Sequence, residues 1–178
     1  MSVQTLQTRF NTVDKTVTGW LAQHSLTILR VTMGIIFVWF GALKLIPGMS
    51  PAEPLIRAAI TFLPMNVFLP FLALWEMAIG LGFITGKFQR VTIILLLMQM
   101  GGAMSPLVLA PDRLWIAFPH QWTLEGQYVF KDIVLIAAAL VIAATVRGGG
   151  LVSDPSALAK NLQRKTQEIR AVLGLGDK

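Results

Sequence analysis

Five polar side chains lie within long apolar stretches of this sequence, and they are the residues best placed to do chemistry. They are Lys44, Glu76, Gln99, Lys131 and Asp132. A charged side chain near the centre of a bilayer costs about 2.5 to 3.5 kcal/mol on insertion scales, so it persists only where an interaction offsets that cost. We therefore treat these residues as the candidate ligand or proton site.

Two interpretations of this polar set stay open. In the first, the carboxyl group of Glu76 exchanges protons in a low dielectric while Lys44 or Lys131 holds an anionic or carbonyl-bearing ligand. In the second, Glu76 pairs with a lysine or shares a proton with Gln99 and only ties the helices together. Lys131 and Asp132 are adjacent, so on a helix they point about 100° apart and are not expected to pair. Neither interpretation needs a metal ion.

Other cofactor chemistry finds little support in the residue types. The chain has no cysteine, which excludes disulfides, thiolate metal sites, iron–sulfur ligation and a thiol redox relay within it. His24 and His120 are expected on opposite sides of the membrane, so they are not two axial ligands of one haem. Met98, Met100 and Met104 are expected to fill space between helices rather than to bind copper.

The candidate residues must be positioned by membrane-spanning helices. The chain has 178 residues, of which 54% are apolar and 13% charged. A spanning helix needs about 20 mainly apolar residues, and four stretches meet this length: 26–46, 67–85, 91–110 and 128–146. We predict an all-α fold, namely an integral membrane four-helix bundle in residues 25–147. An amphipathic interfacial helix in residues 1–24 and a basic amphipathic tail in residues 148–178 flank it.

Lysine and arginine are distributed unevenly among the connections, and this sets the predicted orientation. Positive residues in short loops stay on the cytoplasmic side. Eleven fall on one side, two on the other, and Lys44 and Lys131 lie inside the spans. The eleven are Arg9, Lys15, Arg30, Lys87, Arg90, Arg147, Lys160, Arg164, Lys165, Arg170 and Lys178, and the two are Arg57 and Arg113. Both termini are therefore predicted to be cytoplasmic, with the connections 47–66 and 111–127 outside.

Both terminal segments carry an apolar stripe and are expected at the cytoplasmic face. Near the N-terminus the stripe residues recur at spacings of three and four: Val3, Leu6, Phe10, Val13, Val17 and Trp20. A lipid surface and a partner protein explain such a stripe about equally well. The tail repeats the pattern with Leu158, Leu162, Ile169 and Leu173. The predicted partners are the bilayer and proteins at the cytoplasmic face. No nucleic acid is expected, because the net charge of +6 sits at helix ends and in one tail.

Several groups of residues together resemble a known family. The first span ends in Gly41-Ala-Leu-Lys44, the second carries Trp75-Glu76, and the chain leaves the fourth through Gly148-Gly-Gly-Leu-Val-Ser153-Asp154. In order and spacing this is similar to the DoxX-like family of small four-helix bacterial membrane proteins. The entry to span four, with Glu125 before Lys131-Asp132, resembles a subgroup that includes membrane proteins linked to reactive-chlorine resistance. The family-motif positions are Gly41, Lys44, Glu125, Ser153 and Asp154.

The resemblance implies a location and a class of function. It implies a multi-pass protein of the bacterial cytoplasmic membrane, and an accessory or quinone-facing subunit of a membrane redox or oxidative-stress complex rather than a stand-alone enzyme. A lipid quinone is the cofactor it suggests, with Lys44 or Lys131 as donors to a ring carbonyl and Glu76 as proton carrier. A small-molecule or proton transporter and a structural partner-binding scaffold remain as alternatives. Small-residue faces pack within one chain or between two, so the oligomeric state stays open.

Overall fold

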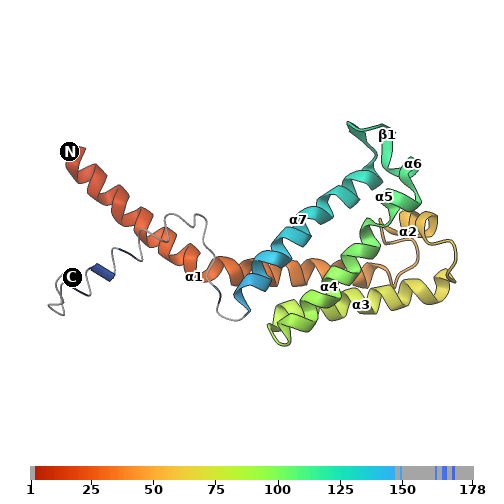
Figure 1. The fold of residues 1–178 in the computed structure, drawn as a ribbon, viewed down its shortest axis with the longest axis horizontal. Helices are drawn as coiled ribbons and strands as arrows, with labels where there is room; N and C mark the ends of the chain where they lie inside the picture. The colour runs from red at the N-terminus through yellow and green to blue at the C-terminus, as the bar shows by residue number, and fades with distance from the viewer. Residues whose placement is uncertain (1–2, 147–148, 150–162, 164–165, 168–169, 171–178) are drawn as a thin grey trace.

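The computed structural model describes residues 3–146, 149, 163, 166–167 and 170, and within them the chain is mostly helical (Figure 1). Four long helices dominate: α1 (Val3–Leu43), α3 (Met65–Thr85), α4 (Gln89–Met104) and α7 (Leu124–Thr145). Three short helices and a small hairpin connect them: α2 (Glu53–Ala59), α5 (Pro106–Leu109), α6 (Pro111–Leu114), β1 (Trp115–Ala117) and β2 (Gln121–Trp122).

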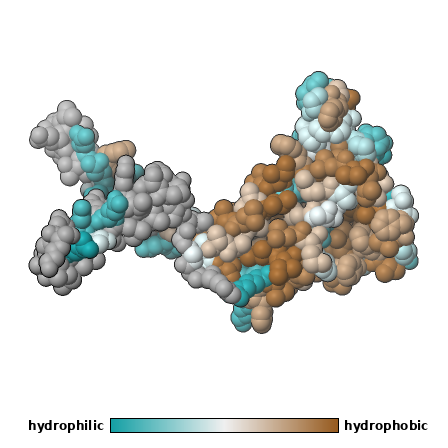
Figure 2. Space-filling view, viewed as in Figure 1, coloured by the Kyte–Doolittle hydropathy of each residue, from teal (hydrophilic) through white to brown (hydrophobic). Residues whose placement is uncertain are grey.

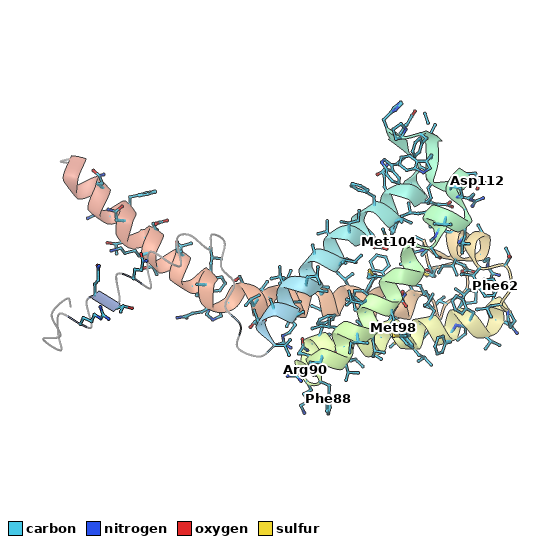
Figure 3. All side chains as sticks on the ribbon, in the orientation of Figure 1. Phe62, Phe88, Arg90, Met98, Met104 and Asp112 are labelled. Atoms are coloured by element: carbon cyan, nitrogen blue, oxygen red, sulfur yellow. The ribbon has the colours of Figure 1, made fainter. Side chains whose placement is uncertain are left out.

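All four predicted spans coincide with helices that are long and apolar enough to cross a membrane. These helical stretches are Arg9–Leu43, Met65–Thr85, Gln89–Leu109 and Leu124–Thr145. Figure 3 places Phe88 and Arg90 at one end of the bundle, and Phe62 and Asp112 at the other. The connections that the charge distribution assigned to opposite sides therefore lie at opposite ends of the bundle (Figure 3).

Two elements differ from the boundaries that the sequence predicted. α1 runs unbroken from Val3 to Leu43, so the predicted border between residues 24 and 25 is not a break in the helix. The sequence around that border, from Trp20 to Ser25, contains neither proline nor glycine, so the hydrogen-bond ladder continues. The third span, in contrast, is interrupted between α4 and α5, where Pro106 has no N–H to continue the ladder.

The connection between α5 and α7 contains strands that an all-α fold did not predict. β1 and β2 form an antiparallel pair in which Trp115 lies opposite Trp122, with ring centroids 3.5 Å apart. Thr123 then caps α7, because its hydroxyl accepts a hydrogen bond from the Gly126 N–H at 2.9 Å. Trp115 and Trp122 thus form a tilted aromatic contact beside the first turn of α7.

Glycines bring the second half of α1 into close contact with α3. A Cβ atom built on Gly80 would lie 2.6 Å from the carbonyl oxygen of Gly34 and 2.6 Å from Val38 Cγ2. α4 packs on α3, and α7 packs on α4 and meets α1 over a smaller area. Met33, Phe37, Ile79, Phe83 and Leu96 belong to the buried core between these helices.

The outer surface of the bundle is apolar. Hydrophilic residues gather at the ends of the bundle and along the first half of α1, which extends beyond it (Figure 2). Leu74, Leu81, Ile94 and Val134 are all more than half exposed on this surface. Water-soluble monomers rarely expose so large a contiguous apolar area. The distribution is the one expected of helices that face lipid.

The end of α3 nearest Arg90 is closed by two side chains. Arg30 Nη1 donates hydrogen bonds to the carbonyl oxygens of Phe83 at 2.6 Å and Ile84 at 3.4 Å. Gln89 Nε2 donates to the Gly82 carbonyl oxygen at 2.8 Å. The last carbonyl groups of a helix have no partner within it, and a cation near them interacts favourably with the helix dipole. Arg30 therefore marks the level at which α1 passes the end of α3.

The glycine contact predicts a stability difference between two alanine variants. In Gly80→Ala the new methyl group meets the α1 backbone, so we expect a loss of about 1 to 3 kcal/mol, as for an overpacked core. Gly101→Ala on α4 is the matched control, because a Cβ there meets nothing within 4 Å. Thermal unfolding in mild detergent should show a lower midpoint for the first variant and an equal or higher one for the second. Equal midpoints would contradict the close approach.

Candidate ligand-binding cavity

A buried ion pair joins the end of α1 to the middle of α3. Lys44 Nζ lies 2.6 Å from Glu76 Oε2, and the two side chains are 4% and 10% exposed. The second carboxylate oxygen, Oε1, accepts a hydrogen bond from Gln99 Nε2 of α4 at 2.8 Å. Both oxygens of Glu76 are therefore satisfied, by residues from two different parts of the chain.

The helices that carry these groups are held at the right separation by specific contacts. A Cβ atom on Gly41 would lie 2.9 Å from the Ala73 carbonyl oxygen, so this glycine lets the end of α1 approach α3 just before Lys44. Trp75 Nε1 donates to the Leu95 carbonyl oxygen at 3.2 Å and ties α3 to α4, one turn before Gln99. The ion pair thus sits where α1, α3 and α4 meet.

A cavity of ≈ 370 Å³ opens beside this cluster. Residues from α1, α2, α3, α4 and α7 line it, and all five polar residues predicted from the sequence are among them. Its remaining wall is largely aromatic and aliphatic. The aromatic members are Phe37, Phe40, Phe68, Phe71, Trp75 and Tyr128. Met98, labelled in Figure 3, also contributes to the wall from the middle of α4. The sequence thus identified the polar residues that share one site, although they are far apart in the chain.

Lys131 is held at the edge of the cavity by aromatic rings rather than by a carboxylate. Its Nζ lies 3.7 Å from the ring centroid of Tyr128 and 5.0 Å from that of Phe40. Such cation–π contacts stabilise an ammonium group by about 0.5 to 2 kcal/mol, depending on desolvation. No ion pair joins Lys131 to Asp132 in the described part of the chain.

Several polar groups of the cavity wall have no hydrogen-bond partner among the described residues. The buried Ser105 Oγ is one of them. The carboxylate of Asp132 and the hydroxyl of Tyr128 are two others, and both residues are half-buried. A buried polar group without a partner costs about 1 to 3 kcal/mol. These groups are therefore available to bind the polar atoms of a ligand.

The short helix α2 covers the cavity at the end of the bundle that also carries α5 and α6 (Figure 1). Its Leu55 and Ala59 are buried. The helix is fixed to the preceding turn by Glu53, whose carboxylate accepts hydrogen bonds from Arg57 Nη2 at 2.7 Å and from the Gly48 N–H at 3.2 Å. The Arg57 hydrogen bonds, and then that from Gly48, lower the pKa of Glu53 from its usual value. An ionised Glu53 therefore keeps α2 in place.

Sequence reasoning missed three parts of this site. It assigned no role to Ser105, to Tyr128, or to α2, which it treated as a loop. A serine before a proline within an apolar span was an available signal for Ser105. Tyr128 is the single tyrosine of the chain, and its position three residues before Lys131 places both on one helix face. Which aromatic side chains line the cavity depends on how the helices cross, and no local pattern encodes that.

The other predicted positions have separate locations. Glu125 does not line the cavity, and its carboxylate pairs instead with Arg113 Nη2 at 3.1 Å, which joins α7 to α6. Ser153 and Asp154 lie outside the described residues, as does most of the predicted tail.

The described residues contain no cluster of three or more His, Cys, Asp or Glu side chains able to hold a metal ion. No family model, curated protein or solved structure matches the chain, so the DoxX-like resemblance stays a prediction from its motifs.

The buried pair predicts a non-additive response to substitution. Lys44→Met leaves the carboxylate of Glu76 buried without its cation, so we expect a loss of about 3 to 5 kcal/mol of unfolding free energy. The double variant Lys44→Met/Glu76→Gln leaves no unpaired charge buried, so it should recover part of this loss. Arg57→Met breaks the exposed pair with Glu53 and is the control, with an effect of about 1 kcal/mol or less. Unfolding curves for the single and double variants in one detergent measure the coupling, and a Lys44→Met curve equal to wild type would contradict it.

Proposed function

We propose that this protein spans the bacterial cytoplasmic membrane four times and binds a lipid-soluble, carbonyl-bearing ring ligand of the quinone class. In this proposal it is an accessory subunit of a membrane redox or oxidative-stress complex. The observation that carries the proposal is the buried Lys44–Glu76–Gln99 cluster beside a largely apolar, aromatic-lined cavity between the helices.

The size and lining of the cavity favour such a ligand. Its volume of ≈ 370 Å³ lies within the range of about 300 to 1,000 Å³ usual for small-molecule sites. The faces of Phe40, Phe71 and Trp75 suit a planar ring, since aromatic groups pack well in offset or edge-on arrangements. The ammonium group of Lys44 and the hydroxyls of Ser105 and Tyr128 are donors, which are the groups that ring carbonyl oxygens require.

The same cluster supplies a route for protons. Reducing a quinone with two electrons requires two protons at its carbonyl oxygens, and the buried Glu76 with Lys44 is the acid–base pair beside the cavity. The chain has no cysteine for thiol or iron–sulfur electron transfer. In this proposal the electrons therefore come from a partner subunit, while this chain positions the ring and moves protons.

Transport is the second candidate, and a specific feature favours it. The span of α4 and α5 is interrupted at Ser105 and Pro106, beside the cavity. Transporters often build their substrate sites from discontinuous helices near the midplane. The carboxyl group of Glu76 would then carry the coupled proton. Proteoliposome uptake at equal rates for wild type and Glu76→Gln would remove this candidate.

Two adjacent glycines of α4 allow a sharp test of ligand binding. Gly102 lines the cavity, Gly101 does not, and a Cβ atom on either meets nothing within 4 Å. Gly102→Leu should therefore place a bulky side chain at the cavity wall with no clash at its Cβ, and Gly101→Leu is the matched control. We expect quinone extracted from gently purified protein to fall about tenfold in Gly102→Leu, the size of effect that a blocked apolar pocket gives, and to be unchanged in Gly101→Leu. Equal quinone in both variants, or none above a control membrane protein, would contradict the proposal.

The proposed orientation has its own test, because the chain has no native cysteine. Single cysteines at Lys15 and Lys87 probe the side assigned to the cytoplasm, and those at Thr61 and Gln121 probe the outside. All four side chains are exposed. A membrane-impermeant maleimide added to intact cells should label only Thr61→Cys and Gln121→Cys, and permeabilised cells should expose the other two. Labelling of Lys87→Cys in intact cells would reverse or refute the orientation.

A further inference from the structure

The first half of α1 carries an apolar face that the bundle leaves uncovered. Phe10, Val13, Val17 and Trp20 are 70%, 62%, 51% and 52% exposed. Figure 1 shows this part of the helix projecting away from the other long helices. At 1.5 Å per residue the helix extends about 40 Å past Arg30, which marks the end of α3. A spanning segment needs only about 20 residues, so most of this extension lies beyond the hydrocarbon.

The uncovered face continues the lipid-facing side of the same helix. Five turns of an α-helix take about 18 residues, so Phe10 and Val17 project in the directions of Ile28 and Ile35. Ile28 and Ile35 are 48% and 55% exposed, whereas Gly34 is buried against α3. Lipid covers Ile28 and Ile35 in a membrane. It does not cover the extension, where the same face meets water.

The spacing on the extension is that of a coiled-coil seam. From Phe10 the apolar residues follow at intervals of three, four and three, to Val13, Val17 and Trp20. A strict alternation of three and four keeps side chains on the narrow seam between two supercoiled helices. Lys15 falls on the opposite face, as expected for the position that points to water.

The charges that flank the seam are complementary between two parallel copies. We take Phe10 and Val17 as the first positions of two successive heptads. Asp14 is then the fifth residue of the heptad that begins at Phe10, and Arg9 is the seventh residue of the heptad before it. In a parallel pair, these positions of opposite chains face each other across the seam. Both side chains are exposed, and neither has a partner within the described part of the chain. Two copies would therefore form the Arg9–Asp14 pair twice.

We propose that the extension of α1 pairs with that of a second copy of this chain as a parallel coiled coil. Copies that cross a membrane in one orientation present their extensions side by side and parallel, and confinement to the membrane raises their effective concentration. α1 has no break at which the extension could turn to lie flat on a lipid surface. The pairing requires the membrane-spanning part of the proposed function, and it is independent of the ligand.

The chain has no cysteine, so single substitutions report on this pairing directly. Val13→Cys places a thiol in the seam and Lys15→Cys places one on the outer face. Disulfides form only when Cα atoms approach within about 7 Å, so in native membranes under mild oxidation we expect Val13→Cys to cross-link to a dimer about tenfold faster than Lys15→Cys. Equal rates, or a product heavier than two copies of the chain, would overturn the proposal.

Charge reversal separates a specific seam from random collision. In the Val13→Cys background, Arg9→Glu should slow cross-linking about threefold, because a like-charge pair replaces an attractive one. Asp14→Arg should do the same, and the combination of both substitutions should restore the original rate. If lipid covers the face instead, Val13→Cys will resist a water-soluble maleimide, remain uncross-linked and ignore the charge changes. That result would refute the pairing while leaving the quinone measurement unaffected.

Discussion

The rest of this structure depends on the cost of burying the carboxylate of Glu76. An ionised carboxylate away from water is tolerated only when it is paired and hydrogen-bonded. Lys44 and Gln99 meet that condition, and they come from the end of α1 and the middle of α4. Three helices must therefore converge at one depth. This requirement places Lys44 and Gln99 at the level of Glu76 and so contributes to the register of α1 and α4 against α3.

Glycine contacts make that convergence possible. The close approach at Gly34 and Gly80, and again at Gly41, holds the second half of α1 against α3. α7 is different, because it packs chiefly on α4 and touches α1 over a smaller area. The cavity lies on this less tightly packed side, between the ion pair and the aromatic faces of Phe40 and Tyr128. A rigid pair of helices thus carries the charged groups, while a more loosely attached helix completes the wall.

The sequence predicted the spans and the polar members of the site because both follow from local composition. Long apolar runs predict helices that can cross a membrane, and Glu76 is conspicuous within one of them. Features that depend on tertiary contacts could not be predicted from the sequence in the same way. Ser105 acquires its role only because the helix breaks beside the cavity, and α2 becomes a cover only because Leu55 finds a buried partner in Leu114. The β-hairpin was missed because its two strands are too short to show alternation, and the unbroken α1 because an interfacial helix and an extended one have the same pattern.

The position of α2 bears on which concentration would govern occupancy of the cavity in the proposed function. This helix lines the cavity and is fastened by Glu53 to the preceding turn, so it lies between the ion pair and the water at that end of the bundle. A ligand of the proposed class, dissolved in the hydrocarbon, would reach the wall laterally. Saturation would then follow the mole fraction of the ligand in the bilayer, and a long isoprenoid or acyl tail would raise the apparent affinity through partitioning, without any contact with the protein.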